Sequence, residues 1–189
     1  MKNLIKLSAL AALSAGIVSA AEYKIDAFHS NVGFVAKHLT ISKVNGNFKS
    51  YDAVVDYDKA TNELKTLTAD IDVTSINTQN EKRDKHLVGD DFFDAAKFPK
   101  IKFQMTKFKK DGANEGKIYG DLTIKNITKP VVLDFEYNGE SKNAEGKEVI
   151  GISLDGEITR ADFDIATNYP DLTISNKIIL KIEIEAKAK

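Results

Sequence analysis

Hydrophobic and polar residues alternate along most of this chain, with the period of two that β-strands show. Residues 67–73, for example, read Leu-Thr-Ala-Asp-Ile-Asp-Val. Further segments of this kind begin near positions 23, 32, 41, 51, 101, 118, 131, 152 and 178. The pattern predicts about eight strands, each with one apolar and one polar face.

One stretch, residues 76–98, interrupts the alternation. Residues 79–88 are mostly polar and are good helix formers, with Asn77 or Thr78 available as N-cap and Gly89 as C-cap. We predict a short helix there. The Asp-Asp-Phe-Phe turn that follows carries two aromatic rings outside any strand or helix. We expect those rings to pack onto the sheet.

The turn and loop signals in the rest of the chain favour an antiparallel sheet. Asn45-Gly46 predicts a turn or bulge, residues 126–130 interrupt the strand pattern, and residues 160–172 read as a long loop. No segment supports a β-α-β crossover, so parallel pairing is not expected. Amphipathic strands with a single covering helix form either a two-sheet sandwich or a closed barrel. A barrel of about eight strands holds its own side chains or one small ligand.

Residues 1–20 have the pattern of a secretory signal peptide. Lys2 and Lys6 precede an apolar run from residue 7 to 18, which is shorter than the ~20 residues that span a bilayer. Small residues then allow cleavage after Ala20 or Ala21. We therefore expect residues 21–189 to form one exported domain in the periplasm, without a membrane anchor.

Composition excludes some partners. Without Lys2 and Lys6, 25 of the 27 basic residues remain against 28 acidic ones, a net charge of about −3. No basic stripe is present, so a nucleic-acid partner is not expected. Cysteine is absent, so the fold must be stable in an oxidising compartment without disulfides.

Motifs for catalysis or metal binding are weak. His86 and Asp90 have i, i+4 spacing, but Gly89 is expected to end the helix between them. His29-Ser30 lacks a nucleophile elbow, and adjacent side chains of a strand point to opposite faces. Residues 81–85 form a mixed charge run typical of a solvated helix face, although Arg83 and Asp84 are also candidates for bracing the helix against the sheet. We expect no catalytic residue, no metal and no cofactor.

Short blocks in a fixed order connect the mature chain to a known family. They are Tyr23-Lys24-Ile25-Asp26, Phe28-His29-Ser30, residues 34–38, Val44-Asn45-Gly46-Asn47-Phe48, Ser75-Ile76-Asn77-Thr78, Arg83-Asp84-Lys85-His86-Leu87, Asp91-Phe92-Phe93-Asp94, Phe98-Pro99-Lys100-Ile101, Gly120-Asp121-Leu122-Thr123-Ile124 and Arg160-Ala161-Asp162-Phe163. In these blocks the chain resembles the YceI-like proteins, bacterial periplasmic polyisoprenoid-binding proteins with a lipocalin-like barrel. Asp164 departs from the resemblance, because the family often has glycine there.

The resemblance implies an extended antiparallel eight-stranded β-barrel with one short helix near its mouth and a long-chain lipid, an isoprenoid or a fatty-chain amphiphile, in its interior. The ten phenylalanines are core residues by default, but rings beside the helix would also suit the mouth of such a cavity. The residues expected to line it are Phe34, Phe48, Ile71, Val73, Phe92, Phe93, Phe98, Phe103, Met105, Leu122, Ile124, Leu154, Leu180 and Ile182. His29, Arg83 and Arg160 are expected at its polar rim.

Three functions compete. The first is a periplasmic carrier that sequesters or transports a lipophilic chain. The second is an enzyme acting on lipids or isoprenoids with His29 or His86 as general base. The third is a structural or interaction sandwich with a filled core. The sequence favours the carrier, and a homodimer through an edge strand or the helix side is compatible with it.

Overall fold

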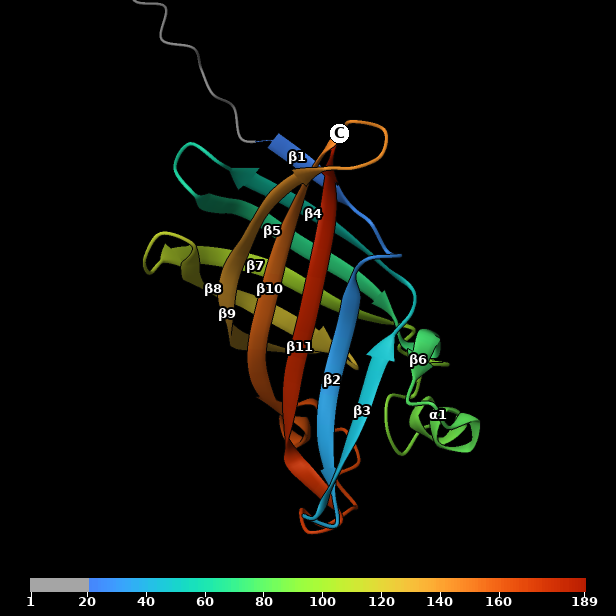
Figure 1. The fold of residues 1–189 in the computed structure, drawn as a ribbon. Coiled ribbons are helices and arrows are strands. Elements are labelled where there is room, and N and C mark those ends of the chain that lie inside the picture. Colours follow the sequence, from blue (N-terminus) through green and yellow to red (C-terminus); the bar gives the residue numbers. More distant parts are fainter. Residues whose placement is uncertain (1–20) are drawn as a thin grey trace, which may run out of the picture.

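The computed structural model describes residues 21–189, which are mostly β-strand (Figure 1). The predicted signal peptide lies outside the described residues. The strands are β1 (Ala21–Ile25), β2 (Asn31–His38), β3 (Ser42–Phe48), β4 (Tyr51–Asp58), β5 (Glu63–Asp72), β6 (Ile76–Asn77), β7 (Lys100–Lys110), β8 (Glu115–Ile124), β9 (Ile127–Lys142), β10 (Glu148–Thr159) and β11 (Ile174–Ala188). The described chain also has one α-helix, α1 (Glu81–Leu87), and two 3₁₀ helices, η1 (Val73–Ser75) and η2 (Arg160–Phe163). None of these helices is long and apolar enough to cross a membrane.

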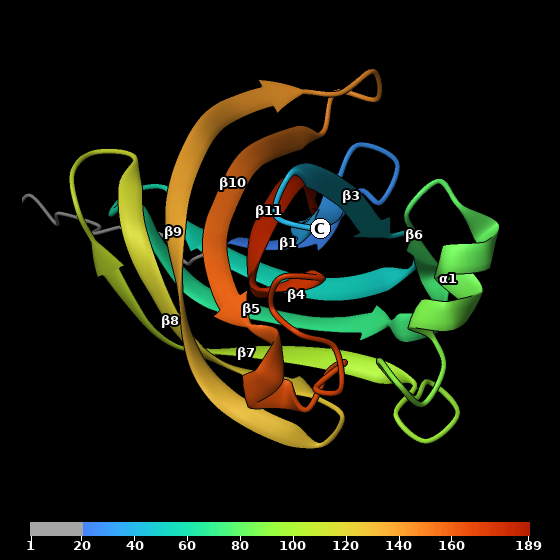
Figure 2. The same cartoon turned by 90° about the horizontal axis from the view of Figure 1, so that it is seen from below.

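The strands close into the predicted antiparallel eight-stranded barrel. Neighbours follow the order β1, β4, β5, β7, β8, β9, β10, β11, and β11 then pairs with β1. The register of this last pair places Tyr23 opposite Ala188 and Ile25 opposite Ala186. Viewed from below, the strands form a ring, and the segment that begins with η2 lies across the near end (Figure 2). The sandwich alternative is therefore wrong.

The β2–β3 hairpin extends the sheet beyond the ring. β1 pairs with the last residues of β11, whereas β2 pairs with residues 174–183 of the same strand. The two short strands thus share one position beside β11, and residues 26–30 form the break between them. β3 pairs with the outer edge of β2 and carries β6 on its other edge. Figure 1 shows this hairpin reaching to the lower tip of the molecule.

The helix is shorter than predicted and has a different N-cap. Asn80 caps it, because its Oδ1 accepts a hydrogen bond from the N–H of Arg83 at 3.0 Å. Gln79 has a φ of 60°, which a right-handed helix excludes. The buried Thr78 instead joins the helix to the end of β6: Asp84 accepts hydrogen bonds from its N–H and O–H, and its Oγ1 accepts one from Arg83 Nε. The proposed bracing role of Arg83 and Asp84 therefore acts through Thr78.

Asn45-Gly46 forms neither a turn nor a bulge, contrary to the prediction. β2 and β3 pair without a register shift through Val35–Asn45 and Phe34–Gly46. A Cβ on Gly46 would lie 2.3 Å from Cζ of Phe34, so the ring occupies the space above the glycine. The same arrangement recurs where Phe103 lies over Gly120, with a distance of 2.4 Å. Glycine at these positions lets an aromatic ring from the neighbouring strand occupy the space that a Cβ would fill.

The interruption predicted at residues 126–130 is shorter and begins one residue earlier. β8 and β9 are joined by Lys125 and Asn126 alone, with φ values of 51° and 61°, the conformation of a tight hairpin turn. Pro130 belongs to β9 and lies opposite Asp121 of β8. β10 pairs with β9 only from Leu133 onward, so a residue without an N–H is tolerated at Pro130.

Candidate functional site

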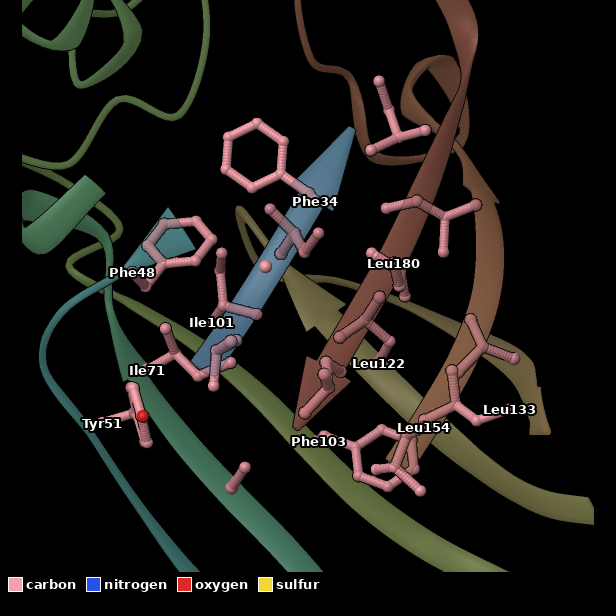
Figure 3. A pocket seen from close by; sticks show the side chains of 18 of the residues that line it. Phe34, Phe48, Tyr51, Ile71, Ile101, Phe103, Leu122, Leu133, Leu154 and Leu180 are labelled. Atoms are coloured by element: carbon pink, nitrogen blue, oxygen red, sulfur yellow. The ribbon is translucent and has the colours of Figure 1, made fainter. Parts of the chain in front are cut away.

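The interior of the barrel contains an apolar cavity of about 190 Å³. Its wall is built from β1, β2 and β3, from β4, β5 and β7 to β11, and from α1 with the segments that follow α1 and β10. Figure 3 shows Phe34, Phe48, Ile101 and Leu180 directed toward one shared space. Nearly the whole wall is hydrocarbon, because the inward positions of the alternating strands are apolar.

Eleven of the fourteen residues predicted to line the interior lie in this wall. They are Phe34, Phe48, Ile71, Phe92, Phe93, Phe103, Leu122, Ile124, Leu154, Leu180 and Ile182. Several are cross-strand neighbours, since Phe103 pairs with Leu122, Leu154 with Ile182, and Phe34 with Leu180. Contact of these residues with a ligand stays a prediction.

The other three predicted residues lie outside the wall. Val73 follows the end of β5 and is buried in η1, where alternation no longer decides the direction of a side chain. Phe98 belongs to the turn before β7, and its N–H donates to the carbonyl of Asp94 at 2.9 Å. Met105 is half-buried against the core.

The turn after α1 covers one side of the cavity, in agreement with the prediction that its aromatic rings pack onto the sheet. Its backbone is tied to the helix, because the N–H of Phe93 donates to the carbonyl of Leu87 at 3.1 Å. The ring of Phe93 meets Phe48 edge-on at 6.1 Å between centroids, and Phe48 lies 5.8 Å from Phe34. Aromatic contacts thus join the helix side to the β2–β3 hairpin.

Arg160 lines the cavity but does not stand on an exposed rim. Its side chain is buried, and its guanidinium donates hydrogen bonds at 2.5–3.0 Å to the carbonyls of Ile165, Ala166, Tyr169 and Ile174. These bonds shape the loop between η2 and β11. Within the described chain, Nε is the guanidinium nitrogen that has no hydrogen-bond partner.

Asp164, the residue where the family often has glycine, adopts the left-handed conformation, with φ 53° and ψ 39°. Aspartate tolerates this region better than most residues. The loop shape that glycine favours is therefore kept.

The other two predicted rim residues lie outside the cavity wall. The side chain of Arg83 is hydrogen-bonded to Thr78: its Nε donates to Oγ1 of Thr78 and its Nη2 to the carbonyl of Thr78, both at 2.7 Å. His29 is exposed, and its Nδ1 lies 3.0 Å from Oδ2 of Asp26 and 3.6 Å from Oε1 of Glu185. A hydrogen bond to Asp26, together with the nearby carboxylate of Glu185, raises the pKa of His29.

Asp26, His29 and Glu185 are close enough to hold a metal ion, but Asp26 already has a partner. Its Oδ2 accepts from Nζ of Lys187 at 2.7 Å, and the bonds from Lys187 and His29 hold its pKa well below the usual range. These groups fasten the break between β1 and β2 to β11. Ser30 takes part through the backbone, because its Oγ bonds to the N–H and carbonyl of Glu185.

Within the described chain, the groups around His86 do not form a catalytic or metal-binding arrangement. Nε2 of His86 lies 3.5 Å from the hydroxyl of Tyr169 and 3.6 Å from Asp91, and its ring packs edge-on against Phe92 at 4.9 Å. His86 and Asp90 do not appear together in any metal-binding cluster of residues 21–189.

A comparison with known families now places the fold. The YceI-like domain matches residues 23–186, nearly the whole described chain. The chain belongs to the YceI-like family.

Relatives of this YceI-like chain cover most of its length. A UPF0312 protein of Staphylococcus aureus strain MSSA476 is 41% identical over 170 residues, 88% of this chain and 95% of that protein. The crystal structure of the Campylobacter jejuni YceI protein superposes with a TM-score of 0.76 at 49% identity, over 81% of this chain and 90% of that one. A domain from Saccharophagus degradans, described as polyisoprenoid binding, shares the fold at 16% identity, with a TM-score of 0.66, over 90% of this chain and 99% of that domain.

Twenty further wall residues of this YceI-like barrel were not among the predicted lining residues, and most of them were signalled by alternation. Val32 and Ala36 share a face with Phe34, and Ile158 shares one with Leu154. The others are Ile25, Ser30, Gly33, Tyr51, Ala53, Leu67, Ala69, Leu87, Ile101, Val131, Leu133, Arg160, Ile165, Ile174, Ile178, Glu183 and Ile184. Arg160 among these was predicted at the rim. Leu87 and Ile165 lie outside strands, so alternation gives no signal for them.

Tyr51 introduces a phenol into this wall. Burial raises the pKa of Tyr51, and the charge of Asp26 adds to the effect. The hydroxyl therefore stays protonated and is available as a hydrogen-bond donor.

Proposed function

We propose that this protein is a periplasmic carrier that sequesters or transports a long-chain lipophilic ligand, a polyisoprenoid or a fatty-chain amphiphile. The observation that carries the proposal is the cavity walled by apolar side chains inside the barrel. Cavities of this kind at β-barrels are common ligand sites. The polyisoprenoid-binding description of the Saccharophagus degradans domain supports the same ligand class.

The volume of the cavity limits the length of chain that it encloses. At ~30 Å³ for each water-sized group, 190 Å³ holds about six methylenes. A chain of about 15 methylenes would gain ~12 kcal/mol if all of it were moved out of water, at ~0.8 kcal/mol for each, before ordering costs of about 4 kcal/mol or more are subtracted. Affinity near the micromolar range therefore requires the barrel to enclose more of the chain than this volume holds.

A polar end group of the ligand has two protein groups to meet. Tyr51 offers a phenol, and Arg160 offers the Nε–H that has no partner among residues 21–189. Both are donors, so we propose that the ligand carries an acceptor oxygen at one end. His29 and Arg83 are engaged by Asp26 and Thr78 and are weaker candidates.

Binding explains the site better than catalysis. Within the described chain, Ser30 bonds to the backbone of Glu185 and His29 to Asp26, so the two do not form a nucleophile and base pair. Export through the signal peptide would deliver the carrier to the periplasm, and its oligomeric state stays a prediction.

Native mass spectrometry of the protein purified from its own periplasm tests the proposal. We expect a stoichiometric additional mass of a few hundred daltons that solvent extraction recovers as a long-chain apolar molecule. A bare protein mass, with no uptake of isoprenoids or fatty amides offered afterwards, would overturn the carrier.

Two neighbouring substitutions locate the ligand. Phe103→Asp places a charge in the wall and should abolish retention, as should Leu122→Asp. Gln104→Asp on the exposed face of the same strand is the matched control and should retain the ligand. Equal retention by folded Phe103→Asp and Gln104→Asp would exclude this cavity as the binding site.

A further inference from the structure

The β2–β3 turn and the loop before β11 meet at the lower tip of the molecule (Figure 1), and both carry exposed apolar residues. Leu39 is 51% exposed and Ile41 86% at the end of the β2–β3 hairpin, and Leu172 is 73% exposed in the loop before β11. The two segments are joined, because the N–H of Leu39 donates to the carbonyl of Thr173 at 3.0 Å. We call Leu39, Ile41 and Leu172 the apolar tip. Half of the six strongly exposed large hydrophobic residues of the described chain therefore lie at one end.

The hairpin turn holds this tip in an unfavourable backbone conformation. Leu39 and Thr40 have φ values of 50° and 61°, and the N–H of Ile41 donates to the carbonyl of His38 at 3.3 Å. Leu39 and Thr40 are the first two of the three residues that connect β2 and β3. Consecutive turn residues with positive φ are normally Asn-Gly or similar pairs, which adopt this conformation at little cost. Here a leucine and a β-branched threonine occupy both positions. The turn therefore exposes apolar side chains where a polar sequence would be more stable.

Two lysines stand directly behind the tip. Lys37 and Lys43 are opposite each other across the hairpin, and both are exposed. Neither forms an ion pair with any carboxylate of residues 21–189. Like charges that face each other across strands are unfavourable. Asp171, the acid beside Leu172, accepts from the N–H of Asn176.

The tip is continuous with the cavity. Ile174 lines the cavity and pairs with His38, the residue just before the turn. Ala36 and Ile178, which face each other one step deeper, also line it. The cavity wall thus reaches the base of the tip.

We propose that the apolar tip docks the protein on the surface of an anionic lipid bilayer, with Lys37 and Lys43 at the level of the headgroups. Apolar side chains ahead of a pair of cations fit the order of layers at such a surface. The inference rests on the proposed function, because a carrier of lipophilic chains loads and unloads where those chains reside. The small contact makes the docking reversible.

A single tryptophan tests the docking directly. The chain has no tryptophan, so Ile41→Trp places one fluorescent reporter at the tip. With vesicles of equimolar phosphatidylcholine and phosphatidylglycerol, its emission should shift to shorter wavelength, and the shift should be weaker with phosphatidylcholine alone. The matched control is Phe28→Trp, at a 97% exposed apolar residue in the β1–β2 break, and its emission should not change.

Charge removal gives the second measurement. Lys37→Gln with Lys43→Gln, in the Ile41→Trp background, should weaken partitioning into the anionic vesicles about thirty-fold, from ~1 kcal/mol for each lysine near a charged surface. Lys24→Gln with Lys109→Gln is the control, because these lysines are also exposed and do not form an ion pair within the described chain. The control should partition like the parent.

Three outcomes would overturn the proposal: no emission shift in the Ile41→Trp variant, equal shifts from both reporters, or a shift that appears without vesicles as protein concentration rises. The last would identify the tip as a contact between copies of the chain. Native mass spectrometry of the same preparations separates this inference from the proposed function. If the protein retains its ligand but does not bind vesicles, the docking proposal alone is wrong. If it carries no ligand, the proposed carrier function is wrong.

Discussion

Arg160 organises the loop between η2 and β11 by donating hydrogen bonds to three carbonyls of the loop and to that of Ile174, the first residue of β11. Carbonyl oxygens buried without a donor are costly, so this loop depends on one side chain. The side chain of Arg83 donates two hydrogen bonds, both to Thr78. At the level of single residues, two arginines that a sequence presents as equal candidates for a head group thus have different structural roles.

Replacing each arginine by alanine should separate these roles. Arg160→Ala should lower the free energy of unfolding by about 3 kcal/mol or more, because several buried carbonyls lose their donor at ~1–3 kcal/mol each. Arg83→Ala should cost about 1–2 kcal/mol. Urea denaturation measures both, and equal losses in the two variants would contradict the role assigned to Arg160.

The Asp26–His29 pair should give stability a defined pH window. The pKa of Asp26 is depressed from 3.8, so its contribution is present above that value and is lost as pH falls through the folded pKa. The pKa of His29 is raised from 6.5, so its contribution is complete below that value and is lost as pH rises through the folded pKa. Stability should therefore be highest between about pH 4 and 6.5.

Urea denaturation at several pH values checks this window. Asp26→Asn is the diagnostic variant, because it removes the acid-side loss and leaves His29 without its first partner. A variant with the same pH profile as the parent would show that other groups set the window.

The strands of this barrel follow from alternation, whereas its breaks and glycines do not. Residues 67–73 reveal β5 directly, since each inward residue is apolar. The division of one barrel position between β1 and β2 depends on pairing with β11, about 150 residues later in the chain, and no local pattern reports it. The need for glycine at position 46 is also invisible in the local sequence, because the ring that requires it belongs to another strand.

The residues of the site are likewise predictable from the sequence where they lie in strands, and not where they lie in the helix or loops. Nine of the eleven predicted residues in the cavity wall lie in strands, where period-two alternation assigns faces well, whereas Phe92 and Phe93 lie in the turn after α1. Leu87 and Ile165 depend on how α1 and the loop after η2 fold back over the barrel. The role of Arg160 depends on loop carbonyls, which every residue carries, so side-chain identity cannot signal it.

A methyl group on Gly46 should disturb the element that it belongs to. In Gly46→Ala the new Cβ would meet the ring of Phe34, and the displaced ring should cost about 1–3 kcal/mol of unfolding free energy. Adding Phe34→Leu should recover part of that loss by making room. Gly151→Ala, whose nearest neighbour would be 3.3 Å away on Asn138, should cost less. An additive loss in the double variant would contradict the ring-over-glycine explanation.

For the molecule as a whole, the cavity volume should set how much ligand is carried. Ala53→Phe adds a ring inside the cavity without introducing charge, and it should reduce the amount or chain length of the retained ligand. Val54→Phe adds the same ring at the adjacent exposed position and should leave retention unchanged. Native mass spectrometry with solvent extraction compares the two. Equal cargo in both variants would mean that the ligand lies elsewhere.

The position of β11 in the ring has a consequence for how the protein is made. β11 follows every other strand of the described chain, and it fills the place between β10 on one side and β1 and β2 on the other. A chain that emerges from its N-terminus first therefore holds an open sheet, with both edges unpaired, until β11 arrives. The pairing of Tyr23 with Ala188 joins the two ends of the described chain, so we expect ring closure to be a late and slow step. The newly made chain should depend on holding chaperones up to the moment its last strand is released.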